Sequence, residues 1–188
     1  MSTDFVIDRK VDIDHLSMFV VDSALDPADL RMVQALAARS QFRRTETDRA
    51  GTRQFSMIAD FNAEKLVHAK FIHRILDIAR TLFPNPPLET NRVHVNSNAY
   101  GDMAYPHRDS VAGGDSVTAM IYANQSWEKD WGGETLFYDG SDEAIACVSP
   151  KPGRLVVFHG LIEHVGSIPS RECYEDRLTL VIKMIPCS

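Results

Sequence analysis

The sequence lacks the features that mark several common protein classes. Its 188 residues include only three cysteines, with no CxxC pair, so no disulfide framework is indicated. No apolar run approaches the roughly 20 residues that a membrane span needs. Basic residues do not predominate either: 20 Lys and Arg against 26 Asp and Glu give a formal charge of −6. An acidic chain disfavours binding to nucleic-acid phosphates, and neither internal repeats nor low-complexity segments occur.

The thiols and the start of the sequence point to the same compartment. An odd number of cysteines fits reduced thiols, and Met1–Phe5 lacks the basic-then-apolar order of a secretory signal. We therefore expect a cytoplasmic protein that binds neither membranes nor nucleic acid. The length predicts a single domain over residues 1–188.

The first half of the chain carries two helix patterns. A helix is predicted over 27–39, because Asp26 is a good N-cap and Pro27 suits the first helical position. A second helix is predicted over 63–83, which has an apolar stripe at helical spacing and ends before a proline. The polar segment 41–60 between them is either a mobile loop over a site or a plain surface connection.

From residue 91 onward the pattern changes to short strands rich in Val, Ile, Thr, Phe and Tyr. The candidates are 92–99, 105–109, 116–124, 134–138, 144–149, 153–159, 163–167 and 176–185. Eight such strands behind a helical layer predict a mostly β protein, a double-stranded β-helix (jelly roll, cupin-like). We expect a mainly helical layer over 1–90 and a jelly-roll core over 91–188, which can enclose a small-ligand cavity.

Two side chains in the segment 105–109 suit a metal ion. His107 and Asp109 are two residues apart, so in a strand both point to one face. By itself an HxD is also a common pattern on a surface strand. A third ligand, His164, lies in a later strand, and two histidines with one carboxylate form the facial triad of non-haem Fe(II) oxygenases. A zinc site with the same ligands is the alternative, and His159 is a weaker candidate near the barrel mouth.

The last strand carries candidate receptors for a carboxylate. Arg177, Thr179 and Val181 alternate onto one face. A guanidinium offers a bidentate fork, and the threonine hydroxyl adds a further donor. The alternative is a salt-bridged strand start beside Glu175 and Asp176.

Tyrosines on two earlier strands are further candidates. Tyr122 shares a face with Thr118, and Tyr100 shares a face with Asn98. Each can donate into a cavity, although packing is the ordinary role of a lone tyrosine.

Taken in order, these segments resemble a known family. They are Asn98-Ala99-Tyr100-Gly101, Tyr105-Pro106-His107-Arg108-Asp109, Val117–Asn124, Trp131-Gly132-Gly133-Glu134-Thr135, Pro152–Phe158, His164 and Arg177-Leu178-Thr179. Their order is similar to that of the iron(II)/2-oxoglutarate-dependent oxygenases, most closely the prolyl-4-hydroxylase-like branch. The similarity covers about residues 92–185.

The resemblance implies Fe(II), 2-oxoglutarate and O₂, with ascorbate as a candidate reductant. It assigns iron ligation to His107, Asp109 and His164, the distal co-substrate carboxylate to Arg177 with Thr179 and Tyr122, and the pocket wall to Tyr100. Arg171 is a weaker rival of Arg177. Because halogenating relatives replace the carboxylate ligand, the presence of Asp109 favours hydroxylation.

The implied reaction hydroxylates an unactivated C–H bond and converts 2-oxoglutarate to succinate and CO₂. The first 90 residues hold no evident peptide-binding repeat, so we expect a small molecule or an amino acid as substrate. A prolyl or peptidyl substrate is one alternative, and a cupin-like metal-binding module without 2-oxoglutarate chemistry is another. Residues that either face the substrate or serve the core or surface are Trp127, Trp131, Arg53, Gln54 and Arg108. No pattern indicates an oligomeric state.

Overall fold

The computed structural model describes residues 4–45, 47–52, 57–66 and 68–187. Its elements, in chain order, are β1 (Arg9–Ile13), β2 (Leu16–Val21), α1 (Pro27–Ala38), β3 (Met57–Phe61), α2 (Ala63–Leu66), α3 (Lys70–Leu82), β4 (Leu88–Asn98), β5 (Val117–Tyr122), the 3₁₀ turn η1 (Lys129–Trp131), β6 (Thr135–Tyr138), β7 (Ala144–Val148), β8 (Leu155–His159), β9 (Glu163–Gly166) and β10 (Arg177–Pro186). Among the described residues, no helix is long and apolar enough to span a bilayer.

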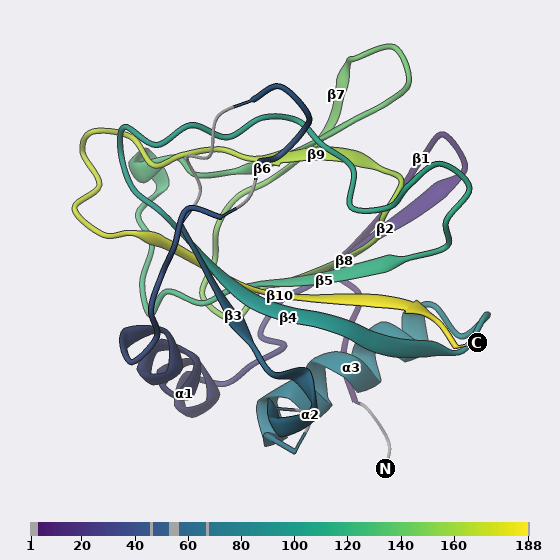
Figure 1. Ribbon diagram of the computed structural model, residues 1–188, viewed down its shortest axis with the longest axis horizontal. Helices are drawn as coiled ribbons and strands as arrows, with labels where there is room; N and C mark the ends of the chain where they lie inside the picture. The colour runs from purple at the N-terminus through teal and green to yellow at the C-terminus, as the bar shows by residue number, and fades with distance from the viewer. Residues whose placement is uncertain (1–3, 46, 53–56, 67, 188) are drawn as a thin grey trace.

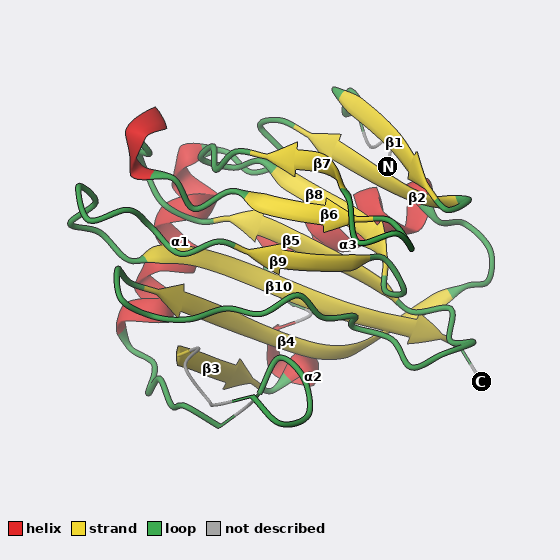
Figure 2. Cartoon of the chain, turned by 90° about the horizontal axis from the view of Figure 1, so that it is seen from above, coloured by secondary structure: helices red, strands yellow, loops and turns green. Residues whose placement is uncertain are grey.

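The strands form two antiparallel sheets. A seven-stranded sheet has the order β1-β2-β8-β5-β10-β4-β3, and a three-stranded sheet has the order β7-β6-β9. The helices cover one face of the large sheet, and the small sheet lies over the other face (Figures 1 and 2). The predicted mostly β jelly roll is confirmed.

Alternation along the central strands separates two cores. On β10, Leu180 and Ile182 pack into the core between the large sheet and the helices. Val181 points the other way, into the core between the two sheets, together with Phe137 of β6 and Phe158 of β8. Because side chains alternate between the faces of a strand, Arg177 and its i+2 neighbours open onto the space between the sheets.

The helical layer is close to the one predicted, with one difference. Asp26 caps α1 by accepting hydrogen bonds from the backbone N–H groups of Ala28 and Asp29, both at 2.8 Å. The single helix predicted over 63–83 is instead two, α2 and α3. The backbone of Ala69 is extended there (φ −74°, ψ 131°) and starts α3 afresh.

Strands also occur where the sequence predicted a helical layer and loops. β1 and β2 form a hairpin, and β3 lies inside the segment 41–60 and pairs with β4. The hairpin turns at Asp14 and His15, both with positive φ (49° and 68°). Conversely, the prediction of a strand over 105–109 is wrong, because that segment makes only an isolated bridge through His107.

Candidate functional site

A single β-bridge sets His107 directly opposite His164. The N–H of each residue donates to the carbonyl of the other, both at 3.0 Å. Residues that exchange both bonds are direct neighbours across the pairing, and the two imidazole centroids lie 4.6 Å apart. Two histidines separated by more than fifty positions in the chain therefore meet through backbone pairing.

The outer nitrogen of each ring is fixed by the backbone. Nδ1 of His107 lies 2.9 Å from the carbonyl oxygen of Tyr105, and Nδ1 of His164 lies 3.0 Å from that of Ile162. A carbonyl only accepts, so both Nδ1 atoms carry the proton and donate. Each Nε2 then keeps a free lone pair, the arrangement in which a second hydrogen bond orients a metal-binding imidazole.

Asp109 completes a group of three donors. Its carboxylate oxygens lie 3.8 Å from Nε2 of His107 and 3.7 Å from Nε2 of His164. One ligand atom from each residue lies within 4.8 Å of the others, so the three side chains could hold one ion. Two imidazoles and one carboxylate leave further positions open on such an ion.

The carboxylate of Asp109 is anchored on both oxygens. Oδ2 accepts from the hydroxyl of Thr118 at 2.6 Å, and Oδ1 lies 2.8 Å from Nζ of Lys183. Burial opposes the charged form, but the neighbouring His164 and Lys183 hold the pKa of Asp109 below its usual range. The group is therefore an anionic, oriented ligand.

His164 is neutral where it lies. Its ring packs against Phe137 (centroids 5.9 Å apart) and Phe158 (4.6 Å). Burial lowers the pKa of His164 to about 4, because the charged imidazolium would lose its hydration. Neutral imidazole is the form that binds metals.

Arg177 lies deep in the space between the sheets and is only 2% exposed. Its Nε donates to the carbonyl of Gly133 at 2.6 Å, and Nη2 donates to Oγ1 of Thr135 at 2.9 Å. Gly133 has φ 78°, and a Cβ there would lie 3.1 Å from the Arg177 side chain. The glycine therefore permits both the turn and the close approach of the guanidinium.

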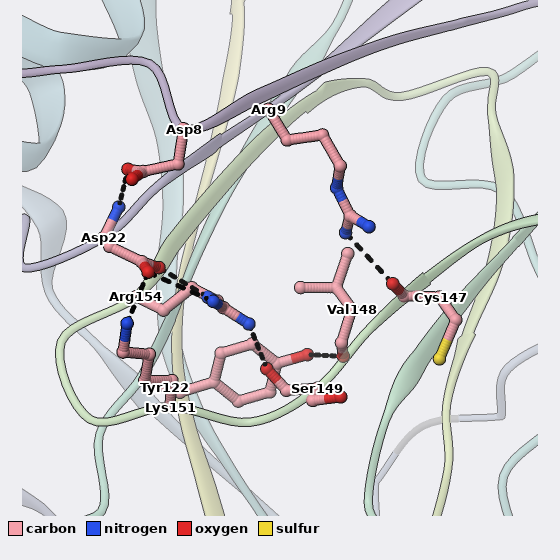
Figure 3. Close-up of polar contacts among 9 residues, drawn as sticks. All are labelled: Asp8, Arg9, Asp22, Tyr122, Cys147, Val148, Ser149, Lys151 and Arg154. Atoms are coloured by element: carbon pink, nitrogen blue, oxygen red, sulfur yellow. Dashed lines mark hydrogen bonds and ion pairs between the residues drawn. The ribbon is translucent and has the colours of Figure 1, made fainter.

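A directed chain of hydrogen bonds continues below Arg177. The hydroxyl of Tyr122 donates to the carbonyl of Val148 at 2.8 Å (Figure 3). Because the hydroxyl proton of Tyr122 is used in this bond, Tyr122 can only accept from the hydroxyl of Thr135, which lies 2.7 Å away. The oxygen of Thr135 in turn accepts from Arg177. The Tyr122 ring also lies 5.1 Å below the guanidinium carbon. This chain holds Arg177 in one orientation.

These groups line one cavity of about 240 Å³. Its wall includes the three donors, Arg177 and Thr179, together with Thr118, which the alternation pattern had already placed on that face. Oγ1 of Thr179 is fully buried and has no hydrogen-bond partner among the described residues. An oxygen-rich ligand between Arg177 and Thr179 would satisfy it.

The two tyrosines assigned to the pocket differ in their exposure. Tyr100 follows β4 in a turn and is 64% exposed, so its expected place on the pocket wall stays a prediction. Tyr122 is buried, but its hydroxyl is used by Thr135 and Val148. It supports Arg177 from behind, and its expected contact with the co-substrate stays a prediction.

The weaker candidates lie elsewhere. Arg171, the rival of Arg177, has a side chain that is 80% exposed and faces Glu172. His159 lies 3.7 Å from Asp115 and stays outside the three-donor group. Trp127 donates to the carbonyl of Gly132 and supports the turn before β6.

The segment 41–60 does reach the cavity. Thr47 and Asp48 are part of its wall, and the carboxylate of Asp48 accepts from the N–H of Tyr105 at 2.6 Å. Arg108, another substrate candidate, also lines the cavity and pairs with Glu163 at 3.2 Å. Arg53 and Gln54 lie outside the described residues.

Two residues of the cavity wall were missed in the sequence. Lys183 is on the same face of β10 as Arg177 and Thr179, and His94 is on the inner face of β4. Extending the alternation of β10 by one more step would have found Lys183, and the polar series His94, Asn96 and Asn98 is visible in the same way.

Comparisons with known proteins agree with this geometry. No curated protein matches the sequence. A prolyl-4-hydroxylase of Pseudomonas putida is 19% identical, with 91% of this chain and 93% of that chain covered and a TM-score of 0.67. A prolyl hydroxylase of Trichoplax adhaerens, in complex with a hypoxia inducible factor peptide fragment, is 17% identical, with 90% and 83% covered and a TM-score of 0.69. The α-ketoglutarate-dependent epimerase SnoN from nogalamycin biosynthesis is 17% identical, with 90% and 78% covered and a TM-score of 0.67.

At these identities the solved structures establish the shared fold alone. The model of the 2OG-Fe(II) oxygenase superfamily matches residues 93–182, a range that contains all three donors and the buried arginine. Residues 93–182, most of the jelly-roll core of this chain, therefore match the model of the 2OG-Fe(II) oxygenase superfamily.

Proposed function

We propose that this protein hydroxylates an unactivated C–H bond of a small molecule or an amino acid, coupled to conversion of 2-oxoglutarate to succinate and CO₂. One observation carries the proposal. Three donors that suit Fe(II) and a buried guanidinium open onto the same cavity of about 240 Å³. The helical layer and the jelly-roll core are proposed to work as one domain.

The donor set fits a divalent iron ion. His107 and His164 would each offer a neutral Nε2, because their Nδ1 protons are held by backbone carbonyls. Asp109 would offer one carboxylate oxygen while the hydroxyl of Thr118 holds the other. Outer partners of this kind orient the ligands and tune the affinity for the ion.

The co-substrate also fits the residues present. Arg177 has five N–H groups, and two of them are used by Gly133 and Thr135. Three remain for the distal carboxylate of 2-oxoglutarate, enough for a bidentate pair. The buried and unpartnered hydroxyl of Thr179 supplies a further donor at the same end.

Each residue then has a defined task. An iron ion held by His107, Asp109 and His164 would supply the oxidising chemistry. Arg177 and Thr179 orient the co-substrate, and Thr118 and Lys183 keep Asp109 charged and directed at the ion. Phe137 and Phe158 exclude water from behind His164.

A peptidyl substrate is the second candidate. The T. adhaerens structure holds a peptide fragment, whereas SnoN is an epimerase of nogalamycin biosynthesis. The shared fold is therefore compatible with peptides and with small molecules. A small cavity with a polar wall favours the small molecule.

Anaerobic titration tests the proposal. The protein is loaded with Fe(II), 2-oxoglutarate is added, and the visible spectrum is followed, with His164→Ala, which removes one of the two imidazole donors, as the control. We expect a charge-transfer band in the wild-type protein only. A folded wild-type protein that gives no band would instead support a cupin-like module without 2-oxoglutarate chemistry.

A further inference from the structure

The cavity wall carries a second cation besides Arg177. Lys183 is six residues farther along β10 and on the same face, which places its Cα about 20 Å from that of Arg177. Its side chain is 25% exposed, and its Nζ lies 2.8 Å from Oδ1 of Asp109. Both cations therefore line the cavity, and Lys183 contacts one of the three donors while Arg177 lies farther along the strand.

Once the site is loaded, Lys183 would have to share its counter-ion, because the Asp109 carboxylate that it contacts is also an expected metal ligand. Under the proposed function, the ion and Arg177 together balance Asp109 and the two carboxylates of 2-oxoglutarate. Arg108 already pairs with Glu163. Lys183 would then share the carboxylate of Asp109 with the ion, and an added anion would give its ammonium group a partner of its own.

The wall next to Lys183 is polar and uncharged. His94 lies directly opposite Val181 in the pairing of β4 with β10, and Asn96 lies opposite Thr179. His94 is 4% exposed, and its Nδ1 has no hydrogen-bond partner within the described part of the chain. Burial and the nearby cations lower the pKa of His94 to about 3, so its ring is neutral. The unpartnered nitrogen and the amide offer hydrogen bonds to a polar ligand.

The same cavity has one carboxylate outside the metal group. Asp48 comes from the segment that covers the cavity, and one of its oxygens accepts from the N–H of Tyr105. A carboxylate has about four acceptor positions, so it can also accept from an ammonium group. A ligand with one negative and one positive end thus meets a complementary charge at each.

We propose that Lys183, flanked by His94 and Asn96, binds the carboxylate of a free amino acid substrate whose ammonium group is received by Asp48. The inference rests on the proposed function and names its substrate class. A cavity of about 240 Å³ is smaller than the roughly 300–1,000 Å³ of ordinary ligand pockets. It holds the co-substrate and a molecule of amino acid size more readily than a peptide chain.

Thermal unfolding of the protein loaded with Zn(II) and 2-oxoglutarate measures binding without turnover. Each proteinogenic L-amino acid is added in four forms: the free acid, its carboxamide, its N-acetyl derivative and the residue within a blocked tripeptide. A ligand that binds the native state raises Tm. We expect at least one free acid to raise Tm in the wild-type protein, and its carboxamide and blocked tripeptide to have no effect.

Variants assign the effect to the lysine. Lys183→Met should raise the Kd of that acid at least about tenfold, Lys183→Arg should restore part of the affinity, and Lys65→Met on exposed α2 should change nothing. The affinity of each variant for 2-oxoglutarate and for Mn(II) is measured in parallel. Lys183→Met should bind Mn(II) more weakly, because Lys183 holds one oxygen of Asp109, so the Kd of the acid is compared in every variant at saturating metal and 2-oxoglutarate.

The inference is overturned if no free amino acid stabilises a wild-type protein that does bind 2-oxoglutarate. It is also overturned if the carboxamide or the tripeptide binds as well as the free acid. A third contrary result is normal binding of the acid by Lys183→Met. The comparison of acid with carboxamide uses the wild-type protein, so it decides the question even if the variant fails to fold. Failure of the wild-type protein to bind 2-oxoglutarate would instead refute the proposed function, and the inference with it.

Discussion

His107 and His164 hold each other in place by two backbone hydrogen bonds of 3.0 Å across an isolated bridge. The segment around His107 forms no strand, so this single bridge and the carbonyl acceptors of the two Nδ1 atoms fix the pair. Asp109 is tied in next to them, because its N–H donates to the carbonyl of Gly160 at 2.9 Å. The ligand geometry is therefore built into the backbone before any ion binds.

His164→Ala should weaken metal binding by more than 100-fold. Loss of an outer partner alone typically costs 10- to 100-fold in affinity, and this change removes a ligand. Mn(II) affinity measured by electron paramagnetic resonance checks the prediction. His159→Ala is the matched control, since that imidazole lies on β8 outside the three-donor group. Equal losses in both variants would contradict the assignment.

Arg177→Met should raise the Kd of 2-oxoglutarate by at least about 10- to 100-fold. Each hydrogen bond to a charged group contributes about 1.5–3 kcal/mol, and the variant removes every N–H group available to the distal carboxylate. Calorimetric titration of the Mn(II)-loaded protein gives the affinity. Arg171→Met removes an arginine that is exposed on the loop before β10, and it should bind as the wild type does. Weakened binding in the Arg171 variant alone would reverse the assignment.

Local patterns predicted much of the core and of the site. Seven of the eight predicted strands are present, because short β-branched runs between Gly, Pro and Asp are a strong signal. The hairpin of β1 and β2 was missed for a physical reason. Its turn takes positive φ at Asp14 and His15. Asn-Gly is the usual signal for such a turn, so Asp-His at these positions did not indicate a hairpin.

The role of each side chain was harder to predict than the face of the strand on which it lies. Alternation placed Arg177 and Thr179 correctly, but it could not show that the hydroxyl of Tyr122 is used by Val148 and Thr135. That bond depends on β7, a strand of the other sheet, and pairing between sheets leaves no periodic trace in one chain. Alternation also gave no guide to Tyr100, because β4 ends at Asn98 and the side chain in the following turn is exposed.

Tyr122→Phe should lower the free energy of unfolding by about 1–3 kcal/mol. The change removes the donor to the carbonyl of Val148 and the acceptor for the hydroxyl proton of Thr135, and a buried polar group that loses its partner costs about that much. Because Thr135 also orients Arg177, the Kd of 2-oxoglutarate should rise a few-fold. Urea unfolding and calorimetry measure the two effects. Tyr174→Phe, at an exposed tyrosine, is the control and should change neither.

Stability should fall in acid through a second network behind the same tyrosine. Asp22 accepts from Nε and Nη2 of Arg154 at 2.6 and 3.1 Å, and Lys151 also pairs with it (Figure 3). The hydrogen bonds from Arg154, reinforced by Lys151 against the effect of burial, lower the pKa of Asp22 to about 2. In the unfolded chain the pKa is near 4. The stabilisation is therefore complete above pH 4 and is lost as the pH falls toward 2.

Asp22→Asn isolates that contribution. It should lower the free energy of unfolding at pH 7 by about 1–2 kcal/mol, after allowance for solvent screening of a partly exposed pair. The variant should also lose less stability than the wild type between pH 4 and pH 2, because it has no carboxyl group to protonate. Urea unfolding at several pH values measures both, with Asp77→Asn on exposed α3 as the control. Parallel acid profiles for the wild type and Asp22→Asn would show that the pair between Asp22 and Arg154 adds nothing to stability. The position of Tyr122 would then depend on packing and on its own hydrogen bonds alone.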